Sequence, residues 1–151
     1  MTAPLLVLGI GNPSRGDDAL GPLFVERVRE AMANEIAHGD VEVLTDFQLQ
    51  VEHALDLLGR ARVVFVDESV RAAPPFELSR VTPRRDASFS THAMSPEAVL
   101  ETCQSVLGTA PESWVLAIRG ERFELGDELS SEASAHLAAA LDAFVAEEGR
   151  R

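Results

Sequence analysis

The sequence has little cysteine and few basic residues, and both shortages exclude classes of protein. A single cysteine, Cys103, occurs among the 151 residues, which excludes a framework of internal disulfide bonds and favours a reducing compartment. The 13 basic residues stand against 25 acidic ones, and the resulting formal net charge of −12 opposes any function that depends on neutralising nucleic-acid phosphates. The apolar N-terminus lacks a basic n-region and is too short to cross a membrane. We therefore expect a cytoplasmic protein with a protein or metal partner.

The chain also lacks internal repeats, linkers and low-complexity segments, so its length decides the domain count. Its residues, 46% of them hydrophobic, are enough to bury one core and too few for two comfortable domains. Short apolar runs alternate with segments whose apolar residues recur at helical spacing. The predicted strands are 5–8, 41–45, 63–66, 76–81 and 114–118, and the predicted helices begin near residues 20, 51, 96 and 131. This alternation predicts one α/β domain over residues 1–151, a three-layer sandwich with a mainly parallel twisted sheet and helices on both faces.

Two adjacent carboxylates follow the first predicted strand. The stretch reads Gly9-Ile10-Gly11-Asn12-Pro13-Ser14-Arg15-Gly16-Asp17-Asp18-Ala19-Leu20-Gly21. A dinucleotide-binding fingerprint would place its third glycine at position 14, where Ser14 stands instead. Two carboxylates at a helix N-terminus also suit a pyrophosphate poorly, because like charges compete with the anion. A metal ion or a proton suits them better, and the alternative is that Asp17 or Asp18 simply caps the helix.

Other acids follow the next two predicted strands. Asp46 ends the second and Asp67 the third, and the chain then continues with Glu68. In an open parallel sheet, ligands bind beyond the carboxyl ends of the strands, where the strand order reverses. If the order is 2-1-3, the turn with Asp17 and Asp18 lies beside Asp67, and Asp46 lies one strand away.

The glycine-rich turn resembles the N-terminal signature of the hydrogenase maturation proteases, the endopeptidases that trim a C-terminal extension from the large subunit of nickel–iron hydrogenases. The residues that match this signature are Gly9, Gly11, Asn12, Asp17, Asp18 and Gly21. The similarity continues more weakly through segments 61–67 and 90–92, and so covers nearly the whole chain in order. Segments 46–53 and 119–126 resemble the branch that serves cytoplasmic NAD-reducing hydrogenases.

The resemblance implies a metal contact and a substrate. Asp18, Asp67 and His92 match the family's metal-binding trio. Two carboxylates and one imidazole can hold a divalent transition metal and still leave coordination positions open. The implied partner is the large-subunit precursor, whose nickel the trio recognises, and the resemblance implies no organic cofactor, no nucleic acid and no membrane. We expect a monomer.

The route of hydrolysis stays open at this point. The catalytic candidates are Asp17, Asp18, Asp67 and His92. Either Asp17 or Asp18 could act as a general base on water, or the metal could polarise the scissile carbonyl as a Lewis acid. The family is grouped with aspartic-type endopeptidases, but the sequence has no Asp-Thr-Gly element of the pepsin kind.

Two other classes compete with the protease interpretation. Peptidyl-tRNA hydrolases also open with a strand and a turn like Gly11-Asn12-Pro13, but their Thr-Arg-His-Asn segment is absent here, and the net charge of −12 argues against the basic face that they need. A nickel-binding chaperone that inspects the precursor without cutting it would use the same trio. Among the remaining reactive residues, Cys103 is expected in the core. The histidines outside the trio show no ligand spacing and are expected to be solvated: His38, His53 and His136.

Overall fold

The computed structural model describes residues 2–85 and 94–151, which form one five-stranded sheet with the order β2-β1-β3-β5-β4. The strands are β1 (Leu5–Ile10), β2 (Val41–Asp46), β3 (Arg62–Ser69), β4 (Phe76–Val81) and β5 (Glu112–Arg119). Strand β1 runs parallel to both of its neighbours, β2 and β3, and β3 runs parallel to β5. Strand β4 runs antiparallel to β5 at the edge of the sheet. The prediction of a mainly parallel sheet is confirmed.

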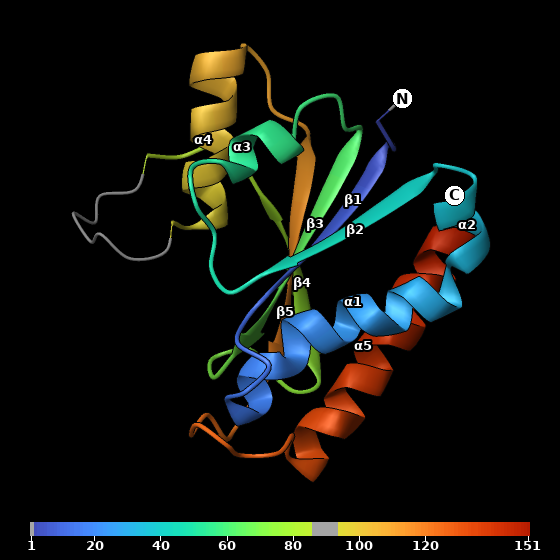
Figure 1. Ribbon diagram of the computed structural model, residues 1–151, viewed down its shortest axis with the longest axis vertical. Helices are drawn as coiled ribbons and strands as arrows, with labels where there is room; N and C mark the ends of the chain where they lie inside the picture. Colours follow the sequence, from blue (N-terminus) through green and yellow to red (C-terminus); the bar gives the residue numbers. More distant parts are fainter. Residues whose placement is uncertain (1, 86–93) are drawn as a thin grey trace.

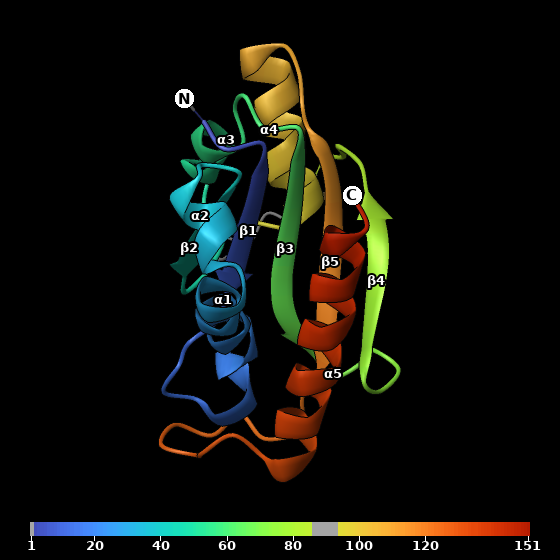
Figure 2. The ribbon, with the colours of Figure 1, turned by 90° about the vertical axis from the view of Figure 1, so that its right-hand side faces the viewer.

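Helices cover both faces of this sheet. They are the 3₁₀ turn η1 (Gly16–Ala19) and the α-helices α1 (Leu20–Ala31), α2 (Ala33–Ala37), α3 (His53–Asp56), α4 (Pro96–Leu107) and α5 (Ser131–Gly149). Helices α1 and α5 lie on one face and α3 and α4 on the other, as Figures 1 and 2 show. The predicted three-layer arrangement is therefore confirmed. In the described part of the chain, no helix is both long enough and apolar enough to span a bilayer.

Alternation along the central strands divides the core between the two faces. Leu5 and Val7 of β1 pack with the residues of α1 and α5, whereas Leu6 and Leu8 pack with those of α3 and α4. All six residues of β1 are buried. A strand covered on both faces needs apolar side chains at every position, which is why this run of the sequence is continuously hydrophobic.

The strand order places the reversal point between β1 and β3. From β1 the chain passes to β2 on one side, and from β3 it passes on to β5 on the other, through β4 and α4. The order 2-1-3, on which the expected meeting of the acids depends, is the observed order, and the carboxyl ends of β1 and β3 flank the reversal point.

Several predicted boundaries differ from the structure. Strand β3 runs on to Ser69, so Asp67 and Glu68 belong to the strand and do not follow it. Pairing with β5 extends this far, with Asp67 opposite Ala117, and a sequence pattern cannot show such partners. Helix α3 is shorter than expected and begins at His53.

Serine side chains cap the first turns of α4 and α5. The Ser95 hydroxyl accepts a hydrogen bond from the Ala98 amide at the start of α4, and the Ser130 hydroxyl accepts one from the Ala133 amide at the start of α5. Each hydroxyl satisfies an amide that the first helical turn leaves without a partner.

Candidate active site

The turn between β1 and α1 is shaped by close backbone contacts. Gly21 lies against Ile10 and Val66, and a Cβ atom at this position would collide with the backbone oxygens of both residues. Gly16 has φ of +56° and lies equally close to the Arg122 carbonyl oxygen. Glycine adopts this left-handed conformation without the usual steric penalty. The glycines of the motif therefore press the turn against the sheet edge and bring its two aspartates to the crevice.

Asp17 binds the loop that leads into α5. Its carboxylate accepts hydrogen bonds from the amides of Glu121, Arg122 and Ser130 at 2.7, 3.0 and 2.7 Å, and from the Ser130 hydroxyl at 2.7 Å. The side chain is fully buried. Burial by itself would raise the pKa of Asp17, but the bonds from Ser130, Glu121 and Arg122 hold it below its ordinary value. Both oxygens therefore bind residues 120–130 to the turn. Figure 2 shows the turn and this loop side by side at one end of the sheet.

Asp18 faces β3. Its Oδ2 accepts one hydrogen bond, from the Asn12 amide at 2.8 Å, while the Asn12 side chain accepts the Ser14 amide at 2.9 Å. Burial raises the pKa of Asp18, although the Asn12 amide and the Arg15 charge oppose the rise. Neither Asp18 nor Asp17 caps a helix: Ala19 precedes α1, and no side chain caps its first turn. The capping alternative is therefore wrong for this turn.

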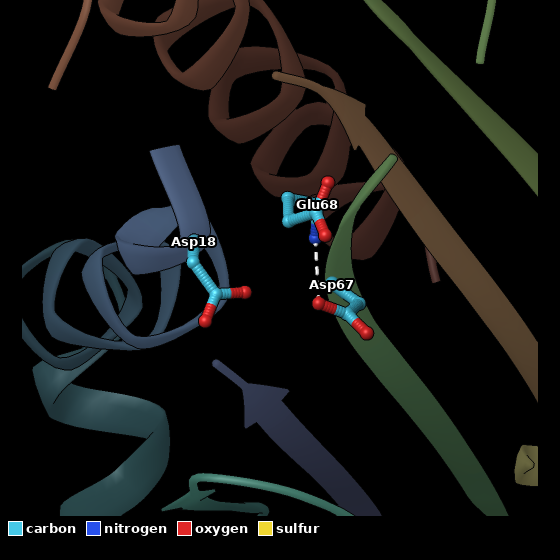
Figure 3. A group of neighbouring side chains, drawn as sticks. All are labelled: Asp18, Asp67 and Glu68. Atoms are coloured by element: carbon cyan, nitrogen blue, oxygen red, sulfur yellow. Dashed lines mark hydrogen bonds between the residues drawn. The ribbon is translucent and has the colours of Figure 1, made fainter. Parts of the chain in front are cut away.

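Asp18, Asp67 and Glu68 form an acidic cluster at the reversal point. One carboxylate oxygen from each lies within 4.8 Å of the others, and all three side chains are partly buried. Figure 3 shows Asp18 across a gap from the two residues of β3. Asp67 accepts the Glu68 amide at 2.8 Å, the dashed line in the same view. The predicted approach of Asp18 to Asp67 is confirmed.

The electrostatics of the cluster favour a bound cation or proton. Burial, followed by the charge of Glu68, raises the pKa of Asp67 to about 7. Burial and the charges of Asp18 and Asp17 raise the pKa of Glu68 to about 7 as well. Like charges in a poorly solvated crevice repel one another, and a proton or a divalent cation relieves that repulsion. Carboxyl groups that titrate near neutral pH can also accept or donate protons in a reaction.

The structure does not bring every expected residue to this cluster, and it adds one. Glu68 was not among the expected site residues, although its place directly after Asp67 in an extended strand was the available signal. Asp17 lies next to the cluster in sequence, but its oxygens accept four hydrogen bonds from the 120–130 loop, so of the two aspartates only Asp18 joins the cluster. His92 lies outside the described residues, and its predicted contact stays a prediction.

Asp46 and His53 make a separate pair. The Asp46 carboxylate lies 3.2 Å from His53 Nε2, and His53 Nδ1 accepts the Gln50 amide at 2.8 Å. These contacts assign the ring proton to Nε2. His53 is buried, so the expectation that it is solvated is wrong, because the segment after β2 folds back on the strand end. His136 is half-buried, and its Nδ1 lies 2.9 Å from the Arg119 carbonyl oxygen.

Cys103 of α4 is buried in the core between this helix and the sheet, as expected. Its thiol lies 3.1 Å from the Thr109 carbonyl oxygen, and burial raises its pKa. A reactive cysteine needs the opposite shift, toward the thiolate. The structure therefore gives no support to a cysteine nucleophile.

Solved structures resemble this chain over nearly its whole length. The [NiFe] hydrogenase maturation protease HycI from Thermococcus kodakarensis KOD1 has a TM-score of 0.72 and 22% identity, over 95% of this chain and 91% of that one. The hydrogenase maturating endopeptidase HybD from Escherichia coli has a TM-score of 0.71 and 23% identity, over 97% of this chain and 91% of that one. The hydrogenase 2 maturation peptidase from a Thaumarchaeota archaeon has a TM-score of 0.65 and 23% identity, over 97% and 99%.

No family model matches the sequence, and no curated protein matches it. The structural likeness nevertheless extends over more than nine-tenths of both chains for these three proteins. The chain therefore has the fold of the hydrogenase maturation endopeptidases, as the resemblance of its first turn predicts.

Proposed function

We propose that this chain is an endopeptidase that removes the C-terminal extension from the nickel-loaded large-subunit precursor of a [NiFe]-hydrogenase. The observation that carries the proposal is the meeting of Asp18 and Asp67 at the strand-order reversal of this fold. Both residues were singled out from the sequence alone, and they come from two segments that lie far apart in the chain. The solved structures that share this fold include maturation endopeptidases, which supports the same activity here.

The nickel ion of the precursor is part of the substrate in this proposal. Asp18 and Asp67 each offer a carboxylate oxygen to it, and His92 would add a ring nitrogen. Glu68 supplies a further oxygen within the same 4.8 Å cluster. Oxygen and imidazole donors suit a divalent transition metal, and an incomplete set leaves positions for the ligands that the precursor itself provides. The chain would thereby engage only precursors that already carry the metal.

A carboxylate of the cluster acts as the general base in this scheme. With Asp67 and Glu68 titrating at about 7, one of the three groups can take a proton from the attacking water near neutral pH. It can then pass that proton to the leaving amine. Asp18 is our candidate for this role, because it faces the gap in Figure 3 from the turn, across from the two carboxylates of β3. When Asp18 takes the proton, Asp67, Glu68 and His92 are the donors left to hold the precursor's nickel, which can then polarise the scissile carbonyl.

We further propose that the chain acts in the cytoplasm as a monomer. The reducing compartment follows from its one cysteine, which is buried as a thiol. The resemblance of segments 46–53 and 119–126 makes a cytoplasmic NAD-reducing hydrogenase the first substrate to try.

The test is to incubate the purified chain with nickel-loaded and with metal-free precursor, and to follow loss of the C-terminal peptide by intact mass. We expect cleavage of the loaded form only. The variants Asp67→Asn and His92→Ala should abolish it, and Asp142→Asn, an exposed change on α5, is the matched control. Equal processing of both forms would refute nickel recognition. Tight binding of the loaded precursor without any cleavage would indicate a nickel-inspecting chaperone.

A further inference from the structure

A cavity of about 340 Å³ opens beside Asp67, on the face of the sheet that α3 and α4 cover. Its floor comes from three neighbouring strands. Phe65 of β3, Val115 of β5 and Ser79 of β4 stand opposite one another in register, and Asp67 stands opposite Ala117 in the next row toward the carboxyl end. The cavity is therefore continuous with the acidic cluster through the Asp67 side chain.

Small side chains and a late helix start create this space. Ala117 is half-buried and Ser79 is exposed, although both lie on the face that carries the core residue Phe65. Helix α4 begins only at Pro96, which itself lines the cavity, so among residues 2–85 and 94–151 no helix lies over the carboxyl end of this face. Elsewhere on the same face, α4 packs the core residues Val99, Leu100 and Cys103 over the sheet.

The walls are apolar and the charged groups are all acidic. Apolar side chains line most of the cavity, and those not yet named are Ile10, Leu49, Val81 and Met94. The ionisable residues in the lining are Asp67, Glu68 and Glu97, and no basic residue is among the described residues that form it. Such a site favours an uncharged apolar group and repels a carboxylate.

We propose that this cavity binds an apolar side chain of the substrate peptide next to the scissile bond, an inference that rests on the function proposed above. A peptide whose scissile carbonyl approaches Asp18 and Asp67 places a flanking side chain over Ala117, one strand away in register. A pocket of this size takes a large apolar side chain together with part of its backbone. Burying that side chain helps to hold the bond in line with the carboxylates.

The first experiment fills the cavity. Ala117→Leu adds three carbon atoms above the floor, and Ser79→Val is a milder change on the exposed edge strand. The control is Ala143→Leu, which fills a separate cavity of about 360 Å³ beneath α5 on the opposite face. The probe is a fluorescent peptide that spans the cleavage junction and carries leucine next to the scissile bond. Binding is read by anisotropy, and cleavage of loaded precursor by mass.

We expect Ala117→Leu to weaken peptide binding and to raise KM by roughly 10- to 200-fold, the range that one misfitting methylene produces in an apolar pocket, with kcat little changed. Ser79→Val should act in the same direction, and Ala143→Leu should act in neither assay. Thermal unfolding checks that each variant is folded. If the filled and control variants bind the peptide equally, the cavity is not the subsite, whatever happens to cleavage. Absence of cleavage by the wild type, with binding still sensitive to Ala117→Leu, would contradict only the proposed activity.

The second experiment varies the peptide. Leucine, arginine and aspartate are placed in turn on each side of the junction, and each peptide is titrated against the wild type and Ala117→Leu. The leucine peptide should bind best, the aspartate peptide worst, and the difference should shrink in the filled variant. A preference for arginine over leucine would show that the acidic rim selects the side chain, and would overturn the assignment of an apolar one.

Discussion

Asp17 and Asp18 are neighbours in one short turn, yet their surroundings are opposite. The Asp17 carboxylate accepts four hydrogen bonds and its pKa is lowered, whereas the Asp18 carboxylate accepts one and its pKa is raised. Asp17 joins the turn to the start of α5, and Asp18 faces two further carboxylates of β3. A charge whose oxygens are saturated by the protein holds the fold together. A charge that the protein leaves largely unpaired is available for a ligand or a reaction.

The same contrast separates structure from chemistry elsewhere at this edge of the sheet. Asp46 also ends a strand, but its oxygens are taken by His53 and by the Phe47 amide at 2.7 Å. Of the acids at the carboxyl ends of the strands, those in the cluster alone keep free oxygens directed at one another, among the residues that the structure describes. Hydrogen-bond saturation therefore distinguishes the candidate catalytic acids from their neighbours better than their positions in the motif do.

The largest expected effect is the loss of processing in Asp18→Asn. Asparagine keeps an oxygen for the Asn12 amide and nearly the same volume, but it removes the charge and the proton acceptor. We expect cleavage of loaded precursor to slow by about 100-fold or more, the usual contribution of a general base, with an unchanged or higher melting temperature. Asp142→Asn serves as the control, and cleavage is followed by intact mass. Normal processing by Asp18→Asn would contradict the proposed role of Asp18 in the reaction.

Asp17→Ala should instead damage the fold. The change leaves the amides of Glu121, Arg122 and Ser130, and the Ser130 hydroxyl, without their acceptor. Buried donors left unpaired cost about 1–3 kcal/mol each, so we expect the free energy of unfolding to fall by about 3 kcal/mol or more in urea titrations. The fraction of molecules that stays folded should still bind the substrate. An Asp17→Ala variant that is stable but inactive would return Asp17 to the catalytic candidates.

Much of this arrangement could be predicted from the sequence, because it follows from local patterns. The strand order 2-1-3, the serine caps of α4 and α5 and the approach of Asp18 to Asp67 depend on apolar periodicity, capping chemistry and the handedness of parallel connections. Each of these signals lies within one element or its immediate flanks.

The division of labour between Asp17 and Asp18 could not be predicted in the same way. It depends on donors more than 100 positions away in the chain, at Glu121, Arg122 and Ser130. The inclusion of Glu68 depends on how far β3 extends beside β5, and the burial of His53 depends on a loop that folds back on β2. Contacts between segments distant in sequence leave no periodic signal. The roles of Asp17, Glu68 and His53 depend on such contacts and therefore could not be predicted.

A smaller effect is expected from Ser130→Ala, which weakens the anchor without removing the charge. The Ser130 hydroxyl donates to Asp17 and accepts the Ala133 amide, so its loss costs one cap and one of four bonds to the carboxylate. We expect a destabilisation of about 1–2 kcal/mol, typical of a lost N-cap, in the same urea titrations. Precursor cleavage should persist. A loss as large as that of Asp17→Ala would mean that the Ser130 hydroxyl, and not the charge, carries the anchor.

The last prediction concerns how stability depends on pH. Unfolded aspartate and glutamate titrate near pH 4, whereas folding raises the pKa of Asp67 and Glu68 to about 7. The folded protein therefore holds these protons more tightly between those values. Their contribution to stability is fully present below about pH 4 and is lost as pH rises through about 7. Above that, two ionised groups repel each other and Asp18 in the crevice.

Asp67→Asn removes one of these charges at every pH, so its effect on stability should depend on where it is measured. At pH 8 the variant should melt at a higher temperature than the wild type, because it relieves the repulsion, and at about pH 4, where Asp67 is protonated in the folded wild type, the two should nearly coincide. The acidic residues outside the cluster titrate alike in both proteins. The difference between the two melting temperatures therefore reports on the cluster. Asp17→Ala should behave in the opposite sense, since the lowered pKa of Asp17 stabilises the fold above about pH 4 and loses its effect as the pH falls. A melting difference for Asp67→Asn that is equal at both pH values would mean that Asp67 is as well solvated as an ordinary surface acid. The contrast between the hydrogen-bonded Asp17 and the acids of the cluster would then not hold for Asp67.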